Sequence, residues 1–151
     1  MHLPHLAPFE RQPLVFLTCC TKTRRAVLAG EQVHVVLKEL WSRSAELDGW
    51  FVGRYLLMPD HVHLFACPAL SAKPLSDWVR MWKSVSSRRL CASLEILPPL
   101  WQRDYFDHFV RNPAAYDEKW RYVEENPVRK GLCGRAEEWS HRGEIHQLNA
   151  R

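Results

Sequence analysis

One long apolar stretch with a single sharp interruption constrains the fold of this chain more than any other feature. Residues 50–67 are rich in large apolar and aromatic side chains, and Pro59-Asp60 divides them in two. Proline and aspartate favour tight turns, whereas the flanking residues favour strands. The sequence therefore predicts an antiparallel hairpin of two strands, residues 50–58 and 61–67.

Two histidines, His61 and His63, are the polar exceptions at the start of the second strand. Side chains two positions apart on a strand share a face, so both imidazoles would point to the same place. Two polar residues on a solvated face would show the same spacing. The apolar surroundings favour a chelating pair for a divalent metal, because a buried polar group without a partner is costly.

The remaining sequence predicts further elements around this hairpin. A short β-branched run predicts a first strand, apolar residues at helical spacing predict two helices, and alternating aromatic residues predict another strand. Asn112-Pro113 is typical of a helix start, and Asn126-Pro127 would end that helix. In order, the predictions are strand 14–20, helix 31–47, the hairpin, helix 73–94, strand 100–111, helix 113–126 and an irregular tail.

This order of elements indicates an α+β fold, a ferredoxin-like antiparallel sheet with helices packed on one face and the histidine strand near its centre. A single domain over residues 1–151 is expected from the length. No apolar run approaches the length of a membrane span and no signal peptide is evident, so a soluble cytoplasmic protein is expected. The five cysteines lack metal-binding or disulfide spacing and are expected to be reduced.

The charge balance is basic. Lysine and arginine number 21 against 17 aspartates and glutamates, which gives a net charge of +4 and a pI near 8.9. Such a balance suits a polyanionic partner without requiring one.

The predicted helix 113–126 supplies a second set of candidate residues. Tyr122 and Asn126 stand four residues apart and would share one face, which Lys119 roughly joins, whereas Tyr116 and Trp120 form a separate pair typical of packing. A free phenol is ionised to about one part in a thousand at neutral pH, so a tyrosine nucleophile needs help. A divalent ion held by the two histidines and one side-chain oxygen would polarise a phosphate for attack by Tyr122.

Three segments carry a resemblance to a known family: residues 55–64 (YLLMPDHVHL), 101–111 (WQRDYFDHFVR) and 122–132 (YVEENPVRKGL). In this order and spacing they resemble the single-tyrosine HUH transposases, and within them the REP-associated tyrosine transposases. The resemblance implies an HUH endonuclease fold and a metal-dependent nuclease and strand transferase, acting on single-stranded DNA that carries imperfect hairpins. It implies Mg²⁺ or Mn²⁺ as cofactor, and either a monomer or a homodimer.

Site roles follow from the same resemblance. His61 and His63 would be metal ligands and Tyr122 the nucleophile. Asn126 would stand where relatives place a metal-binding glutamine, although its amide is one methylene shorter, and a water or the DNA itself would fill the position if the amide does not reach. Tyr105 is a rival nucleophile, but strands favour tyrosine for packing. Asp104 and Asp107 would face opposite sides of their strand and are expected to serve structure or DNA contacts.

Contacts to DNA are expected from basic side chains, with Trp78, Trp82 and Trp101 offering stacking surfaces for unpaired bases. The predicted basic contacts are Arg24, Arg25, Arg80, Lys83, Arg88, Arg89, Arg103, Arg129 and Lys130.

Two other functions remain open from the sequence. One is a catalytically silent hairpin-binding domain, which would bind DNA without cleaving it. The other is a metal-dependent phosphodiesterase or ribonuclease without a covalent intermediate, in which Tyr122→Phe would leave cleavage intact.

Overall fold

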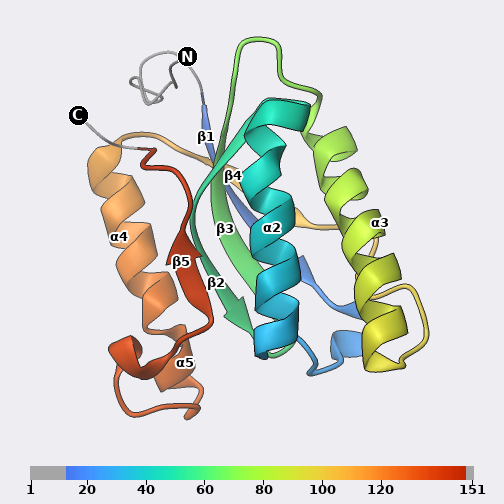
Figure 1. Ribbon diagram of the computed structural model, residues 1–151. Coiled ribbons are helices and arrows are strands. Elements are labelled where there is room, and N and C mark those ends of the chain that lie inside the picture. Colours follow the sequence, from blue (N-terminus) through green and yellow to red (C-terminus); the bar gives the residue numbers. More distant parts are fainter. Residues whose placement is uncertain (1–12, 149–151) are drawn as a thin grey trace.

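The computed structural model describes residues 13–148 as a five-stranded sheet with helices on both faces (Figure 1). The strands follow the order β4-β1-β3-β2-β5, and every pairing is antiparallel. The strands are β1 Leu14–Cys20, β2 Trp50–Met58, β3 His61–Pro68, β4 Phe106–Val110 and β5 Arg142–Glu144. The helices are α2 Glu31–Asp48, α3 Leu75–Leu94, α4 Pro113–Glu124 and α5 Asn126–Arg129, with 3-10 turns η1 Lys22–Arg24 and η2 Ala136–Glu138.

The predicted hairpin forms as expected. Met58 pairs with His61 across the Pro59-Asp60 turn, and the register continues through His63, opposite Leu56. On its other side β3 pairs with β1, so the histidine strand lies at the centre of the sheet. The α+β fold class and the central position of β3 are confirmed.

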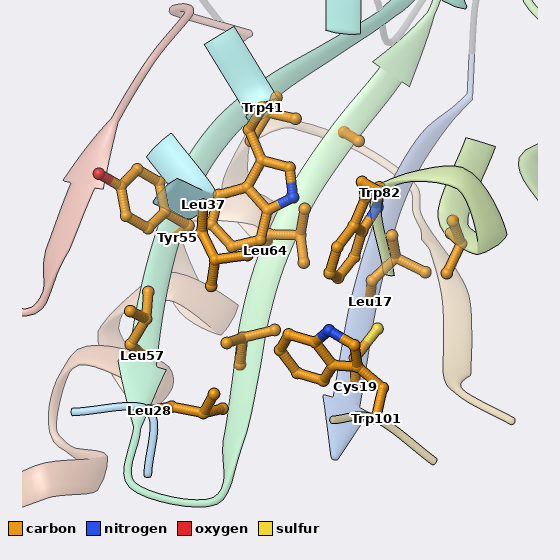
Figure 2. Packing of buried hydrophobic residues seen from close by; sticks show 14 of the residues in the cluster. Leu17, Cys19, Leu28, Leu37, Trp41, Tyr55, Leu57, Leu64, Trp82 and Trp101 are labelled. Carbon is orange, nitrogen blue, oxygen red and sulfur yellow. The ribbon is translucent and has the colours of Figure 1, made fainter. Parts of the chain in front are cut away.

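One face of the sheet is closed by α2 and α3, which lie beside each other in Figure 1. Figure 2 shows Trp41 of α2 and Trp82 of α3 packed over the β-strands, with Trp101 next to them. Trp82 lies between the other two, with ring centroids 5.4 Å from Trp41 and 5.5 Å from Trp101. Trp78, Trp82 and Trp101 are all buried. The prediction that they stack on DNA bases is therefore wrong, because their rings fill the core.

The opposite face is covered by α4. Tyr116 and Val123 of this helix pack with Phe16, Leu56 and Phe65, which point away from α2 and α3. The prediction of helices on one face only is thus corrected. The central strands are apolar on both faces, so each face needs a cover.

Two further differences concern the strands at the two edges of the sheet, β4 and β5. The predicted strand 100–111 is shorter, since only Phe106–Val110 pairs along β1 and Trp101 makes an isolated bridge with Thr21. The tail, predicted to be irregular, contributes β5, in which Gly143 pairs with Tyr55 of β2.

Local signals explain the helix boundaries. Gly49, at φ 79°, ends α2 in the left-handed conformation that glycine tolerates best. Asn112 caps α4 by accepting a hydrogen bond from the Ala115 amide, and Pro113 occupies the first turn. All five cysteines are free, as predicted. Within residues 13–148, no helix combines the length and apolar character that crossing a membrane requires.

Candidate active site

His61 and His63 lie on the α4 face of the central strand. Their positions alternate with Val62 and Leu64, which belong to the α2/α3 core. The two ring centroids are 4.7 Å apart and the planes meet at 79°. The strand geometry thus brings both imidazoles together, as the sequence predicted.

Each imidazole has its Nδ1 atom fixed by a neighbour. The Asp60 carboxylate accepts from His61 Nδ1 at 2.8 Å, and Thr18 Oγ1 lies 2.9 Å from His63 Nδ1. Arg24 donates to the other oxygen of Asp60 at 3.0 Å. Histidines that ligate metals through one nitrogen commonly donate a hydrogen bond through the other. The arrangement leaves the Nε2 atoms of both rings for a metal.

The protonation state also suits metal binding. Burial lowers the pKa of His63 to about 3, and the nearby His61, Lys119 and Arg129 act in the same direction. Burial lowers the pKa of His61 as well, although Asp60 opposes that shift. Both imidazoles are therefore neutral at pH 7, which is the form that ligates a metal.

Any third protein ligand would differ in type from the histidines. In the described part of the chain, no three side chains from His, Cys, Asp and Glu come together in a way that would hold a metal. The amide of Asn126 is the candidate from the sequence. Its Oδ1 lies 3.4 Å from Arg129 Nη2, and the residue begins α5, which Glu125 separates from α4. The expected continuous helical turn from Tyr122 to Asn126 is therefore broken, because α4 ends at Glu124.

Tyr122 lies on α4, so it is on the histidine face of the sheet, with 64% of its surface exposed. The Arg129 guanidinium carbon stands 3.9 Å from the centre of its ring. The same guanidinium donates to the Tyr122 carbonyl at 2.8 Å. Arg129 thereby fixes both the ring and the backbone of the candidate nucleophile.

Phe16 links α4 to the histidines. Its ring stacks on His63 at 5.3 Å between centroids, and Lys119 Nζ lies 4.8 Å from the same ring. Beside this contact is a hollow of about 620 Å³ between β4 and α4, lined in part by His108, Lys119 and Tyr122. The nucleophile candidate and a lysine therefore border the same hollow, and Phe16 connects this lysine to His63.

The protein family of this chain follows from a comparison with known proteins. The family described as "Transposase IS200 like" matches residues 14–126, which hold β1, the histidine pair and α4. The chain belongs to this family. The resemblance to tyrosine transposases stated from the sequence is confirmed.

Two relatives with transposase names are similar to the chain. A REP-associated tyrosine transposase of Escherichia coli K12 is 25% identical over 130 residues, covering 82% of this chain and 72% of the relative. The ISDra2 transposase TnpA of Deinococcus radiodurans is 37% identical over 89 residues, 56% of this chain and 60% of the relative.

Two solved structures share the fold. A REP-associated tyrosine transposase bound to a REP hairpin aligns with a TM-score of 0.72 at 21% identity, covering 86% of this chain and 75% of that one. A transposase-like protein from Deinococcus radiodurans aligns with a TM-score of 0.56 at 25% identity, covering 76% of this chain and 90% of the other. The antiparallel α+β architecture is thus the architecture of IS200-like transposases.

Three of the predicted DNA contacts are bound to backbone carbonyls or to Asp60 of the histidine turn. Lys83 is buried, and its ammonium donates to the carbonyls of Gln102, Arg103 and Asp104 at 2.9, 3.4 and 3.1 Å. Arg25 donates to the carbonyls of Leu97 and Pro99, and Arg24 holds Asp60. These side chains order loops or the histidine turn, so the phosphate-binding role predicted for Lys83 is wrong.

The other predicted cations divide between two places. Arg129 and Lys130 lie near the histidines, since Lys130 lowers the pKa of His61 and Arg129 that of His63. A second hollow, of about 980 Å³, lies between α3 and the segment 98–105. Arg80, Arg88 and Arg103 line it. Arg89 instead pairs with Glu39 of α2.

Sequence reasoning missed the residues that orient the histidines. Asp60 was noted only as a turn residue, although a carboxylate next to a metal-binding histidine is a recognisable signal. Thr18 carries no such signal, because its contact depends on the register of β1 against β3. The rival Tyr105 is half-buried, and burial raises its pKa, which makes it less suited to attack.

Proposed function

We propose that this chain is a metal-dependent endonuclease and strand transferase for single-stranded DNA, and that it forms a 5′-phosphotyrosine intermediate at hairpin-bearing sequences. The observation that carries the proposal is the pair of neutral imidazoles, each fixed at Nδ1, on the face that α4 and Tyr122 share. Family membership supports a DNA-processing role.

Two imidazoles and an oxygen fit a divalent transition ion such as Mn²⁺ better than Mg²⁺, which prefers oxygen ligands; the family resemblance implies either of these two ions. His61 and His63 would hold it, with Asn126, a water or the DNA supplying oxygen. When bound, the ion would act as a Lewis acid on the scissile phosphate. Asp60 and Thr18 keep the two rings in position, so little reorganisation is needed when the ion arrives.

Tyr122 supplies the covalent step. Its phenolic oxygen attacks the phosphorus and loses its proton, a P–O bond to tyrosine forms, and the bond to the 3′ oxygen breaks to leave a 3′-hydroxyl. Attack by a 3′-hydroxyl on the phosphotyrosine reverses the exchange and joins strands without an external energy source. Arg129 holds the Tyr122 ring, and Lys119 beside His63 offers a positive charge for the phosphate.

The hairpin partner is proposed from the relatives. One solved relative is bound to a REP hairpin, and the E. coli relative is REP-associated by name. The cations around the histidines suit a phosphate backbone.

The test incubates the protein with hairpin-bearing single-stranded oligonucleotides and Mn²⁺ or Mg²⁺, and looks for a protein–DNA adduct that survives denaturation. We expect an adduct from the wild type, none from Tyr122→Phe, and none with EDTA. Tyr105→Phe is the matched control and should still form it. Cleavage that persists in Tyr122→Phe would indicate a phosphodiesterase, and binding with no cleavage of any hairpin would indicate a silent binding domain; either result overturns the proposal.

A further inference from the structure

Strand β4 forms an outer edge of the sheet and carries two exposed aromatic rings. Phe106 is 76% exposed and Phe109 is 65% exposed. The register against β1 places Phe106 with Thr18 on the histidine face and Phe109 with Val15 on the α3 face. Large apolar rings on an exposed edge are a liability for a monomer and usually mark a binding surface.

The segment that carries these rings borders both hollows. Tyr105 lines the hollow under α3, and residues 108–111 line the hollow next to α4. Segment 98–105 forms one wall of the hollow under α3 and is held by two side chains of that helix. Lys83 Nζ donates to three consecutive carbonyls of the segment, and Ser87 Oγ accepts from the Leu100 amide at 2.9 Å. This surface is therefore preformed.

Charge separates this surface from an ordinary apolar edge. Every charged side chain that lines the α3 hollow is basic. Lys83 is buried, and the other four are exposed: Lys22, Arg80, Arg88 and Arg103. Arg80 also pairs with Asp77 at 2.7 Å. The α4 hollow contains Arg111, Lys119 and His108 together with one carboxylate, Glu118. The basic side chains of the two hollows suit phosphates and the exposed rings suit unpaired bases. Asp104 and Asp107 on the β4 segment and Glu118 on α4 are the acidic side chains along this edge.

We propose that the β4 edge is the track of an unpaired DNA strand, which runs from the basic α3 hollow across Phe106 and Phe109 into the α4 hollow beside Tyr122. The arginines of the first hollow hold phosphates, and the two phenyl rings stack on unpaired bases. The bases of duplex DNA are stacked on each other, so they cannot stack on these rings. The inference rests on the proposed function, because it assigns the path of the same substrate strand.

Binding of fluorescein-labelled dT20, measured by anisotropy, tests the rings. Phe106→Ser and Phe109→Ser should each weaken binding about tenfold, and the double variant more. Both rings are largely exposed, so the melting temperature should stay unchanged. Leu47→Ser and Val35→Ser, which alter exposed apolar residues on α2, are the matched controls and should bind as the wild type does. Wild-type affinity in the double variant would overturn the proposal.

Salt dependence tests the arginines. Arg88→Gln with Arg103→Gln should lower the slope of log affinity against log salt by about two, about one for each lost phosphate contact. Lys38→Gln on α2 should leave the slope unchanged. An unchanged slope in the double arginine variant would contradict the assignment of this hollow.

Photo-crosslinking locates the strand directly. With 5-iododeoxyuridine in the dT20 probe, the crosslink should fall in the tryptic peptide 104–111, which contains Tyr105, Phe106 and Phe109. A crosslink only elsewhere would overturn the track. So would a loss of self-association in Phe106→Ser/Phe109→Ser with dT20 affinity unchanged, because the edge would then pair with a second copy of the chain.

Failure of the two proposals can be told apart. If the wild type forms the phosphotyrosine adduct and the phenylalanine variants bind dT20 normally, only the track is wrong. If no adduct forms with any hairpin but the variants still lose dT20 binding, the track stands and the proposed chemistry fails.

Discussion

The two faces of the sheet are built from the same strands and do different work. On the α2/α3 face, two helices and five buried tryptophans close the core, and Trp78 Nε1 donates to Ser44 Oγ at 2.8 Å. On the α4 face a single long helix leaves a hollow lined in part by Lys119 and Tyr122, and Phe16 connects Lys119 to the ring of His63. Alternation along β3 sends Val62 and Leu64 to one face and His61 and His63 to the other. The apolar core and the proposed active site thus lie on opposite sides of one strand.

Trp82→Ala should produce the largest effect on the closed face. Its side chain is fully buried and contacts Trp41 and Trp101, so its removal should lower the free energy of unfolding by about 3–5 kcal/mol. Urea unfolding measures the loss. Tyr122→Phe is the counterpart on the open face and should change the free energy of unfolding by less than about 0.5 kcal/mol, because the side chain is exposed.

The contrast between the two faces would be wrong if Tyr122→Phe lowered the free energy of unfolding by more than Trp82→Ala does. Below the unfolding transition, the fraction of Trp82→Ala protein that stays folded should still form the DNA adduct at the wild-type rate per molecule. A folded Trp82→Ala protein that has lost adduct formation would show that the closed face takes part in the chemistry.

The secondary structure was easier to predict than the way its elements pack. The hairpin, the long helices and the central histidine strand follow from turn residues, helical spacing and alternation, all of which are local signals. The side on which α4 packs does not follow. Strands that are apolar on both faces do not tell which face a later helix covers.

Long-range register accounts for what else was missed at the site. Thr18 contacts His63 only because β1 pairs with β3 in one particular register. The spacing of residues along the sequence does not reveal that register. β5 is three residues long, too short for alternation to reveal. The tryptophans of α3 and Trp101 were ambiguous for a different reason, since aromatic rings serve cores and nucleic-acid surfaces equally well.

Thr18→Val sharpens the comparison on the open face. The change keeps the shape of the side chain and removes the oxygen that faces His63 Nδ1. Loss of such an outer contact typically weakens metal binding 10–100-fold, and calorimetric titration with Mn²⁺ measures it. Ser44→Ala is the matched control, because it removes a buried hydroxyl on the closed face. It should reduce stability by about 1 kcal/mol and leave Mn²⁺ affinity unchanged.

Equal Mn²⁺ affinity in Thr18→Val and wild-type protein would argue against a metal on His63 Nε2. Weaker Mn²⁺ binding in Ser44→Ala would instead show that the two faces are coupled through the strands, and the division of labour between them would be weaker than the structure indicates.

The pH dependence of stability gives the smallest effect at any one pH and tests the burial of His63 itself. Its pKa is lowered from 6.5 to about 3 in the folded protein. Above pH 6.5 the ring is neutral in both states and contributes nothing. Between pH 6.5 and 3 the unfolded chain binds a proton that the folded protein does not, so the free energy of unfolding falls by up to about 1.4 kcal/mol per pH unit as the pH drops.

Urea unfolding with EDTA at pH 7, 6 and 5 measures this slope for the wild type and for His63→Asn. Groups away from the histidine pair titrate alike in both proteins, so the difference between the two curves reports on His63 together with its neighbour His61. We expect the variant to lose less stability than the wild type on acidification, with the gap widening below pH 6.5. Parallel curves would mean that the ring is protonated in the folded protein as readily as in the unfolded chain. The neutral, metal-ready form of the open face would then not be enforced by burial.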